Sequence, residues 1–124
     1  GKSDSEYQRF QKAIHLSADL QVYIVLKGAY TRIFTPEGDV YFNSTGNAGM
    51  ATAGSGDVLA GVITGLLAQK YPPLNAVVLG VFLHGLSGDM ALNHETEETL
   101  IASDLIENLK SAYSILHVYK NDSK

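Results

Sequence analysis

A glycine-rich stretch followed at once by a helical apolar pattern constrains this chain more than any other feature. Five of the twelve glycines lie at residues 45–61, where the sequence reads TGNAGMATAGSGDVLAG. Glycine adopts loop conformations that other residues disfavour, so a cluster of this kind lets backbone N–H groups turn inward toward one point. The stretch therefore predicts an anion-binding loop.

A helix is predicted to begin directly after this loop, near Ser55 or Asp57. Apolar residues recur there with helical spacing, at Val58, Leu59, Val62, Ile63, Leu66 and Leu67. The first N–H groups of a helix lack intrahelical acceptors and the helix dipole is positive at that end, so a phosphate would be stabilised there. Asp57 is the only formally charged residue between Asp39 and Lys70. Its position fits either a helix cap or a catalytic carboxylate.

The stretch resembles the nucleotide loop and catalytic helix of the ribokinase-like superfamily, and within it the NAD(P)H-hydrate dehydratases. Sugar kinases of that superfamily usually carry a GAGD variant, whereas Asn47, Gly49, Met50 and Ala51 ahead of GSGD are similar to the dehydratase branch. The resemblance continues upstream in LKGA, from residue 26, and downstream in HGLSGDMA and IASDLIENL, from residues 84 and 101. It covers nearly the whole chain.

This resemblance implies roles for individual residues. Asp57 would contact the substrate and act as the catalytic base. Lys27 ends an apolar strand-like run, where a lysine can reach a phosphate above the edge of a sheet. The residues implied at the nucleotide site are Lys27, Gly28, Ala29, Tyr30, Thr31, Asn47, Ala48, Gly49, Met50, Ala51, Thr52, Ala53, Gly54, Ser55 and Gly56. ADP, or ATP in other branches, would be the co-substrate, with Mg²⁺ bridging its phosphates and no metal ligands evident in the chain.

The implied activity is the repair of hydrated NADH or NADPH. The nucleotide phosphorylates the ring hydroxyl, phosphate then leaves, and the reduced cofactor is restored. Two alternatives stay open: a kinase of the same fold that acts on a sugar or a vitamin precursor, and a nucleotide-binding fragment without activity. A stable phosphorylated product would indicate the kinase, and nucleotide binding without turnover would indicate the inactive module.

Composition excludes some partners and indicates a compartment. With 45% hydrophobic and 18% charged residues and a formal charge of −4, the chain has a globular balance and no basic stripe for nucleic acid. The apolar run at residues 76–86 is too short for a bilayer. Without cysteine or a signal-like N-terminus, we expect a cytoplasmic protein. The resemblance further implies a homo-oligomer and allows an epimerase domain fused in the parent chain.

The remaining pattern predicts an α/β fold. VYIVL, at residues 22–26, is typical of a strand buried on both faces of a largely parallel sheet. The other predicted elements are a helix over 1–20, a hairpin of strands 31–35 and 39–43, a helix from 74 or 75 to 92, and a last helix from 103 or 104. In the 74–92 helix, Gly80, Gly85 and Gly88 are expected to be close-packing positions. His84 is expected to be a hydrogen-bonded core histidine, and Asp89 a packing or supporting residue.

About three strands and four helices provide too little cover for a doubly wound sheet. The resemblance explains this: the family fold is a ribokinase-like three-layer α/β/α sandwich, and residues 1–124 correspond to its C-terminal part, with no internal boundary. We therefore expect a fragment of the dehydratase domain with an exposed sheet edge.

Overall fold

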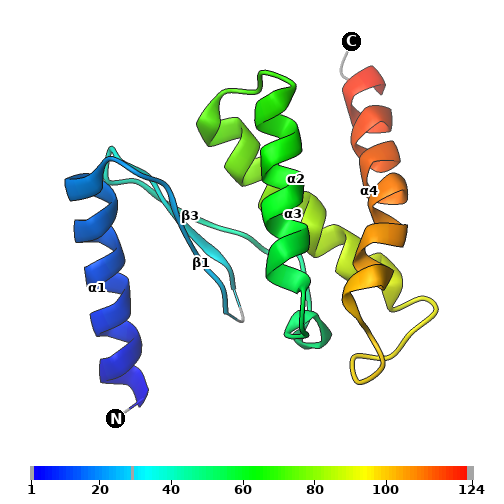
Figure 1. The fold of residues 1–124 in the computed structure, drawn as a ribbon, viewed down its shortest axis with the longest axis horizontal. Coiled ribbons are helices and arrows are strands. Elements are labelled where there is room, and N and C mark those ends of the chain that lie inside the picture. Colours follow the sequence, from blue (N-terminus) through cyan, green and yellow to red (C-terminus); the bar gives the residue numbers. More distant parts are fainter. Residues whose placement is uncertain (1, 29, 123–124) are drawn as a thin grey trace. The chain divides into compact units, whose positions relative to one another are not determined.

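The computed structural model describes residues 2–28 and 30–122, which fall into two compact units, Gly1–Asn43 and Ser44–Lys124 (Figure 1). The first unit contains a helix and a small sheet. The second contains three α-helices and a short 3₁₀ turn. The architecture is α/β, as predicted. That the units belong to one domain without an internal boundary stays a prediction.

The first unit contains one helix and three short strands: α1 (Lys2–Leu20), β1 (Ile24–Leu26), β2 (Arg32–Phe34) and β3 (Val40–Phe42). The strands form an antiparallel sheet in the order β1-β2-β3. The predicted hairpin between β2 and β3 is confirmed. Its turn places Gly38 at φ +95°, a conformation that favours glycine, and the Gly38 N–H donates to the Thr35 carbonyl at 3.1 Å.

The three described strands pair only antiparallel, so a position of residues 22–26 in a largely parallel sheet, buried on both faces, stays a prediction for the whole domain. Among the described strands β1 pairs antiparallel with β2, and its three residues are half-buried. Its apolar run resembles a parallel core strand because both settings accept β-branched residues. The buried strand is instead β2, where Ile33 is 1% and Phe34 0% exposed.

Helix α1 packs on the sheet through aromatic and small side chains. The rings of Phe10 and Phe34 meet edge to face, with centroids 5.2 Å apart, a favourable geometry for an aromatic pair. The guanidinium of Arg32 lies 5.8 Å from the centre of the Phe10 ring, within the range of a cation–π contact. Ala13 of α1 is buried, whereas Tyr7 is 65% exposed.

The second unit contains η1 (Ala48–Met50), α2 (Ser55–Ala68), α3 (Pro73–Ala91) and α4 (Ala102–Asp122). Each α-helix begins within two residues of its predicted start. Pro73 occupies the first turn of α3, where a missing N–H costs no hydrogen bond. Asp104, the third residue of α4, accepts a hydrogen bond from the Ile101 N–H at 2.8 Å, which is the contact that the third helical residue makes in a capping box.

Helix α3 is the core of the second unit, and it packs against both α2 and α4 (Figure 1). A Cβ atom at Gly80 would lie 2.7 Å from Ile63 Cγ1 of α2. A Cβ at Gly85 would collide with Thr45, and one at Gly88 with the Met50 side chain. The prediction that these glycines allow close packing is confirmed, because no larger residue fits at the three positions without displacing a neighbour.

Helix α3 is also long and apolar enough, by length and composition, to cross a membrane, with a mean hydropathy of 1.3. However, 56% of that window is buried inside the fold. The core helix of a globular domain passes the same test, and the buried His84 and Ser87 both lie on α3.

Candidate active site

The segment from residue 44 to 54, here called the glycine loop, leads into α2 and is attached to α3. The Thr45 hydroxyl donates to the Phe82 carbonyl at 2.9 Å. Gly46 and Gly54 have φ values of +107° and +85°, so the loop uses glycine at two positions where other residues would be strained. Gly54 is the residue directly before α2. The predicted start of the helix is confirmed, and residues 44–54 form a glycine-containing loop ahead of it; that this loop binds an anion stays a prediction.

A carboxylate of α3 holds the first part of this loop. Asp89 accepts a hydrogen bond from the Gly46 N–H through Oδ2 at 2.9 Å, and one from the Asn47 side-chain amide through Oδ1 at 3.0 Å. The Oδ1 atom of Asn47 in turn accepts from the Gly49 N–H at 3.0 Å and caps η1. The loop backbone is thus fixed by side chains as well as by its own turns.

A buried histidine of α3 fixes the end of the loop where α2 begins. The Nε2 atom of His84 lies 3.0 Å from the Ser55 carbonyl oxygen and 3.3 Å from Ser55 Oγ. Because a carbonyl only accepts, Nε2 carries the hydrogen in the first of these bonds. His84 is 5% and Ser55 1% exposed. The prediction that His84 is a hydrogen-bonded core histidine is confirmed, and the contact anchors the first residue of α2.

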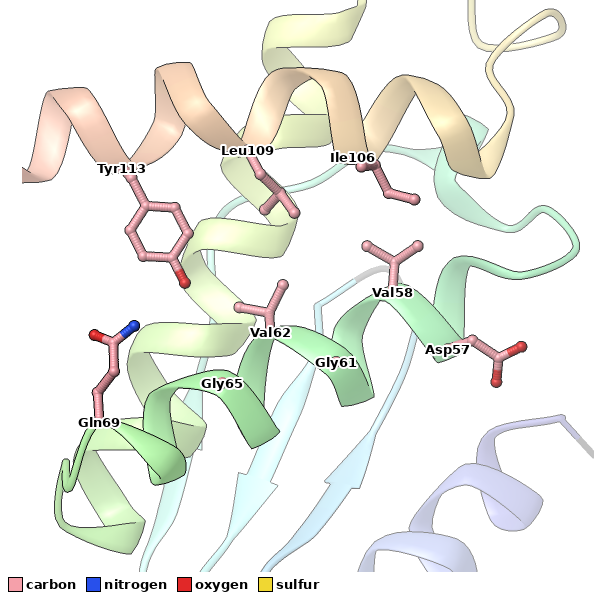
Figure 2. A pocket seen from close by; sticks show the side chains of 9 residues that line it. All are labelled: Asp57, Val58, Gly61, Val62, Gly65, Gln69, Ile106, Leu109 and Tyr113. Atoms are coloured by element: carbon pink, nitrogen blue, oxygen red, sulfur yellow. The ribbon is translucent and has the colours of Figure 1, made fainter.

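Asp57 lies in the first turn of α2 and is exposed. The N-terminus of α2 carries partial positive charge, which stabilises an anionic carboxylate there. Figure 2 shows the Asp57 carboxylate directed away from Val58 and Ile106. An exposed carboxylate beside a helix N-terminus can accept a proton from a substrate hydroxyl while the backbone donors of the same helix end bind a phosphoryl group.

Asp57 also marks one end of a groove of about 490 Å³ between α2 and α4 (Figure 2). The rest of the lining is mainly apolar: Val58, Gly61, Val62, Gly65, Gln69, Ile106, Leu109 and Tyr113. Val58 and Val62 of α2 face Ile106 and Leu109 of α4 across it (Figure 2). The groove brings an apolar surface next to the predicted catalytic carboxylate.

Tyr113, at the other end of the groove, gives a prediction for alkaline pH. Burial, and to a smaller extent the nearby Tyr71, raises the pKa of Tyr113 above its ordinary value of 10.0. The fold therefore favours the neutral phenol, and this contribution to stability is present below pH 10 and is lost as the pH rises through the folded pKa. Denaturant unfolding should show that Tyr113→Phe loses less stability than wild type between pH 8 and pH 11. Equal losses would contradict the assignment.

The structure distributes the predicted loop residues between buried and exposed positions. Gly49, Met50 and Ser55 are buried, Asn47 and Thr52 are half-buried, and Ala48, Ala51, Ala53, Gly54 and Gly56 are exposed. The Met50 side chain belongs to a core cluster with Ala91, Leu100 and Leu105. The Ser55 N–H donates to the Thr52 carbonyl at 3.2 Å. Because the Met50 side chain is packed in this core cluster, any contribution of Met50 to a nucleotide site would come from its backbone.

The upstream part of the predicted nucleotide site lies in the other unit. Lys27, Gly28 and Tyr30 are exposed, and Thr31 is half-buried. Ala29 lies outside the described residues. Because these positions belong to the first unit and the glycine loop to the second, their convergence on one nucleotide stays a prediction.

The residues described include no group of three or more His, Cys, Asp or Glu side chains that could hold a metal ion. The sequence predicted Asp89 to be a packing or supporting residue, and its hydrogen bonds to the loop agree with the supporting alternative, although the sequence did not identify Gly46 and Asn47 as the partners. The available signal was the HGLSGD segment, in which Gly85, Gly88 and Asp89 all lie against residues of the loop.

Comparison with known proteins identifies the family. Residues 1–111 match the model of the NAD(P)H-hydrate dehydratase family. A bifunctional NAD(P)H-hydrate repair enzyme of Thermofilum pendens is 45% identical over 118 residues, which are 94% of this chain and 22% of that protein. An ADP-dependent (S)-NAD(P)H-hydrate dehydratase of Bacillus subtilis is 37% identical over 107 residues, which are 86% of this chain and 39% of that protein.

The structural comparison agrees. A crystal structure of the ADP/ATP-dependent NAD(P)H-hydrate dehydratase from Bacillus subtilis, co-crystallised with ATP/Mg²⁺, matches with a TM-score of 0.81 at 37% identity, over 88% of this chain and 39% of that one. A ribokinase-like protein from Enterococcus faecalis matches with a TM-score of 0.64 at 37% identity, over 79% of this chain and 34% of that one. The chain thus spans about a fifth to two fifths of the length of these relatives and has the ribokinase-like fold in part. It belongs to the NAD(P)H-hydrate dehydratase family.

Proposed function

We propose that this chain is the C-terminal part, residues 1–124, of an enzyme that dehydrates hydrated NADH or NADPH with ADP as phosphoryl donor. The observation that carries the proposal is the exposed Asp57 in the first turn of α2, directly after a loop that α3 fixes at both ends. The family match over residues 1–111 supplies the substrate class. The donor follows the name of the Bacillus subtilis relative, and ATP is the alternative.

The proposed chemistry begins with phosphoryl transfer. Asp57 accepts the proton of the ring hydroxyl as that oxygen attacks the terminal phosphoryl group of ADP, and the bond to the leaving AMP breaks. Backbone N–H groups of the glycine loop and of the α2 N-terminus hold the phosphoryl oxygens. The ring carbon–oxygen bond then breaks, inorganic phosphate departs in place of hydroxide, and loss of a ring proton restores the reduced cofactor.

The nucleotide site we propose combines both predicted segments. The glycine loop supplies Asn47 to Gly54, followed by Ser55 and Gly56, and the first unit supplies Lys27 to Thr31. Mg²⁺ would enter bound to the nucleotide phosphates, because the described residues offer no metal cage of their own. We further propose a cytoplasmic homo-oligomer, and an epimerase domain in the parent chain by analogy with the bifunctional relatives.

The test is a product assay with the full-length protein. Hydrated NADH is mixed with Mg²⁺ and with ADP, ATP or no nucleotide, and the absorbance of regenerated NADH is followed together with inorganic phosphate. We expect both products in equal amounts, only when nucleotide is present and faster with ADP. A stable phosphorylated product without NADH would instead identify a small-molecule kinase. Neither product from a folded protein that binds nucleotide would show a binding module without activity.

A further inference from the structure

We propose that Asp89 is a positioning residue for the glycine loop, which sets the loop conformation that binds the nucleotide phosphates. The inference rests on the proposed function for the identity of the ligand. Its structural part concerns how a carboxylate of α3 determines the path of residues 46–50, and that part is measurable without any ligand.

Both carboxylate oxygens of Asp89 are used on the loop. Oδ2 accepts from the Gly46 backbone at 2.9 Å and Oδ1 accepts from the Asn47 amide at 3.0 Å. Hydrogen bonds to an ionised acceptor are roughly twice as strong as neutral ones. Asp89 is half-buried and is the only formally charged residue of α3. A charge at such a position is costly unless it is hydrogen-bonded, and its bonds go to the loop.

Asn47 transmits the effect of Asp89 to the next turn. Because Asp89 accepts from Nδ2, the amide of Asn47 is oriented with Oδ1 toward the Gly49 N–H, at 3.0 Å. A flipped amide would place its NH₂ group against the Gly49 N–H and its oxygen against the Asp89 carboxylate, and both hydrogen bonds would be lost. Asn47 is also the N-cap of η1, and its carbonyl accepts from the Met50 N–H at 3.2 Å. Asp89 therefore determines which way η1 is capped.

The loop has little freedom to adopt another path while this contact holds. A Cβ atom at Gly49 would lie 2.7 Å from the Glu97 carbonyl oxygen, so η1 is packed closely against the backbone that follows α3. Met50 is seated over Gly88, one residue before Asp89. Close packing thus fixes the loop at Gly49 and Met50, and hydrogen bonds to the Asp89 carboxylate fix it at Gly46 and Asn47.

The test is an exchange of the two side chains that meet. In Asp89→Asn, position 89 has only one acceptor oxygen for the two donors, the Gly46 N–H and the Asn47 amide, so one of the two hydrogen bonds is lost. In Asn47→Asp, two carboxylates face each other and repel. In the double variant Asp89→Asn with Asn47→Asp, the new amide at 89 donates to the new carboxylate at 47, which still accepts from Gly49. The double variant also has the charge of the wild type.

We expect the Kd for Mg-ADP, measured by calorimetry on the full-length protein, to rise at least tenfold in each single variant and to return within about threefold of wild type in the double variant. In turnover, the single variants should raise the KM for nucleotide more than they lower kcat. Hydrogen exchange of the Gly49 and Met50 amides without ligand should be faster in each single variant and slow again in the double variant. Asp104→Asn, which removes another carboxylate that accepts a backbone N–H, should leave the Kd unchanged.

Two results would overturn the inference in distinguishable ways. Unchanged ADP affinity and unchanged exchange in folded Asp89→Asn, or a double variant no better than the single ones, would refute positioning by Asp89 and leave the proposed function intact. The second result is a wild type that binds no ADP, while hydrogen exchange at Gly49 is still faster in the single variants and slow in the double variant. The proposed function then fails, and so does the claim that Asp89 positions the loop for a nucleotide.

Discussion

Replacing Asp57 with asparagine is expected to lower the turnover of hydrated cofactor by about 10²- to 10⁴-fold, the usual contribution of a general base. Asparagine has nearly the same shape but cannot accept the hydroxyl proton. Since Asp57 is exposed and in the first turn of α2, the change removes little packing. The affinity for Mg-ADP should stay within a fewfold of wild type, so the loss should appear in kcat, measured by regenerated NADH and phosphate.

Asp104→Asn is the matched control for this variant, because Asp104 lies in the first turn of α4 as Asp57 lies in that of α2. Each change weakens a favourable interaction between a carboxylate and a helix N-terminus, at a cost of about 0.3–1 kcal/mol in stability. Only Asp57→Asn should stop turnover. Equal, small effects of both variants would reduce Asp57 to a helix-capping residue and remove the main support for the proposed mechanism.

Gly85→Ala is expected to lower the free energy of unfolding by about 1–3 kcal/mol, the usual cost of overpacking. The added Cβ would collide with Thr45 Oγ1 and lie 2.7 Å from the Thr45 carbonyl carbon. Thr45 cannot move away cheaply, because its hydroxyl is bonded to the Phe82 carbonyl on the same helix. Its displacement would also shift Gly46 from Asp89, so ADP affinity should fall together with stability. Chemical denaturation and calorimetry measure the two effects.

Gly65→Ala is the matched control in α2, because the space around a Cβ at Gly65 is open to 4 Å. Alanine is the better helix former, and this variant should gain about 0.5–1 kcal/mol. If Gly85→Ala were stabilised to a similar degree, Thr45 and the loop would have to be free to move, contrary to the packing described here. A destabilised Gly85→Ala with unchanged ADP affinity would separate the fold from the site.

The helices and the loop were predictable from the sequence because their signals are local. The loop and the start of α2 are predicted by the glycines, by the apolar stripe that follows them and by Asp57 at the start of that stripe. The start of α3 is predicted by the prolines at 72 and 73. The close packing at Gly80, Gly85 and Gly88 of α3 was predictable, because glycine is unfavourable in a helix unless close packing requires it.

The strand environment and the loop contacts were not predictable in the same way. The pattern VYIVL does not reveal which strand becomes its neighbour, so the antiparallel pairing of β1 with β2 emerged only from the structure. Asp89 meets Gly46 and Asn47 across more than forty residues of sequence. No spacing rule reports a contact of that range, whereas the family resemblance of HGLSGD indicated that the segment had a role.

The seating of the glycine loop on α3 limits how the site could be transplanted. A graft of residues 44–57 alone onto another pair of helices would lack the Asp89 carboxylate that binds Gly46 and the His84 imidazole that binds Ser55. It would also lack the two glycines of α3 against which Thr45 and Met50 pack. The smallest portable module is therefore discontinuous: the loop together with residues 82–89. Transfer of the loop without residues 82–89 would keep the sequence of the motif but lose the contacts that determine its conformation.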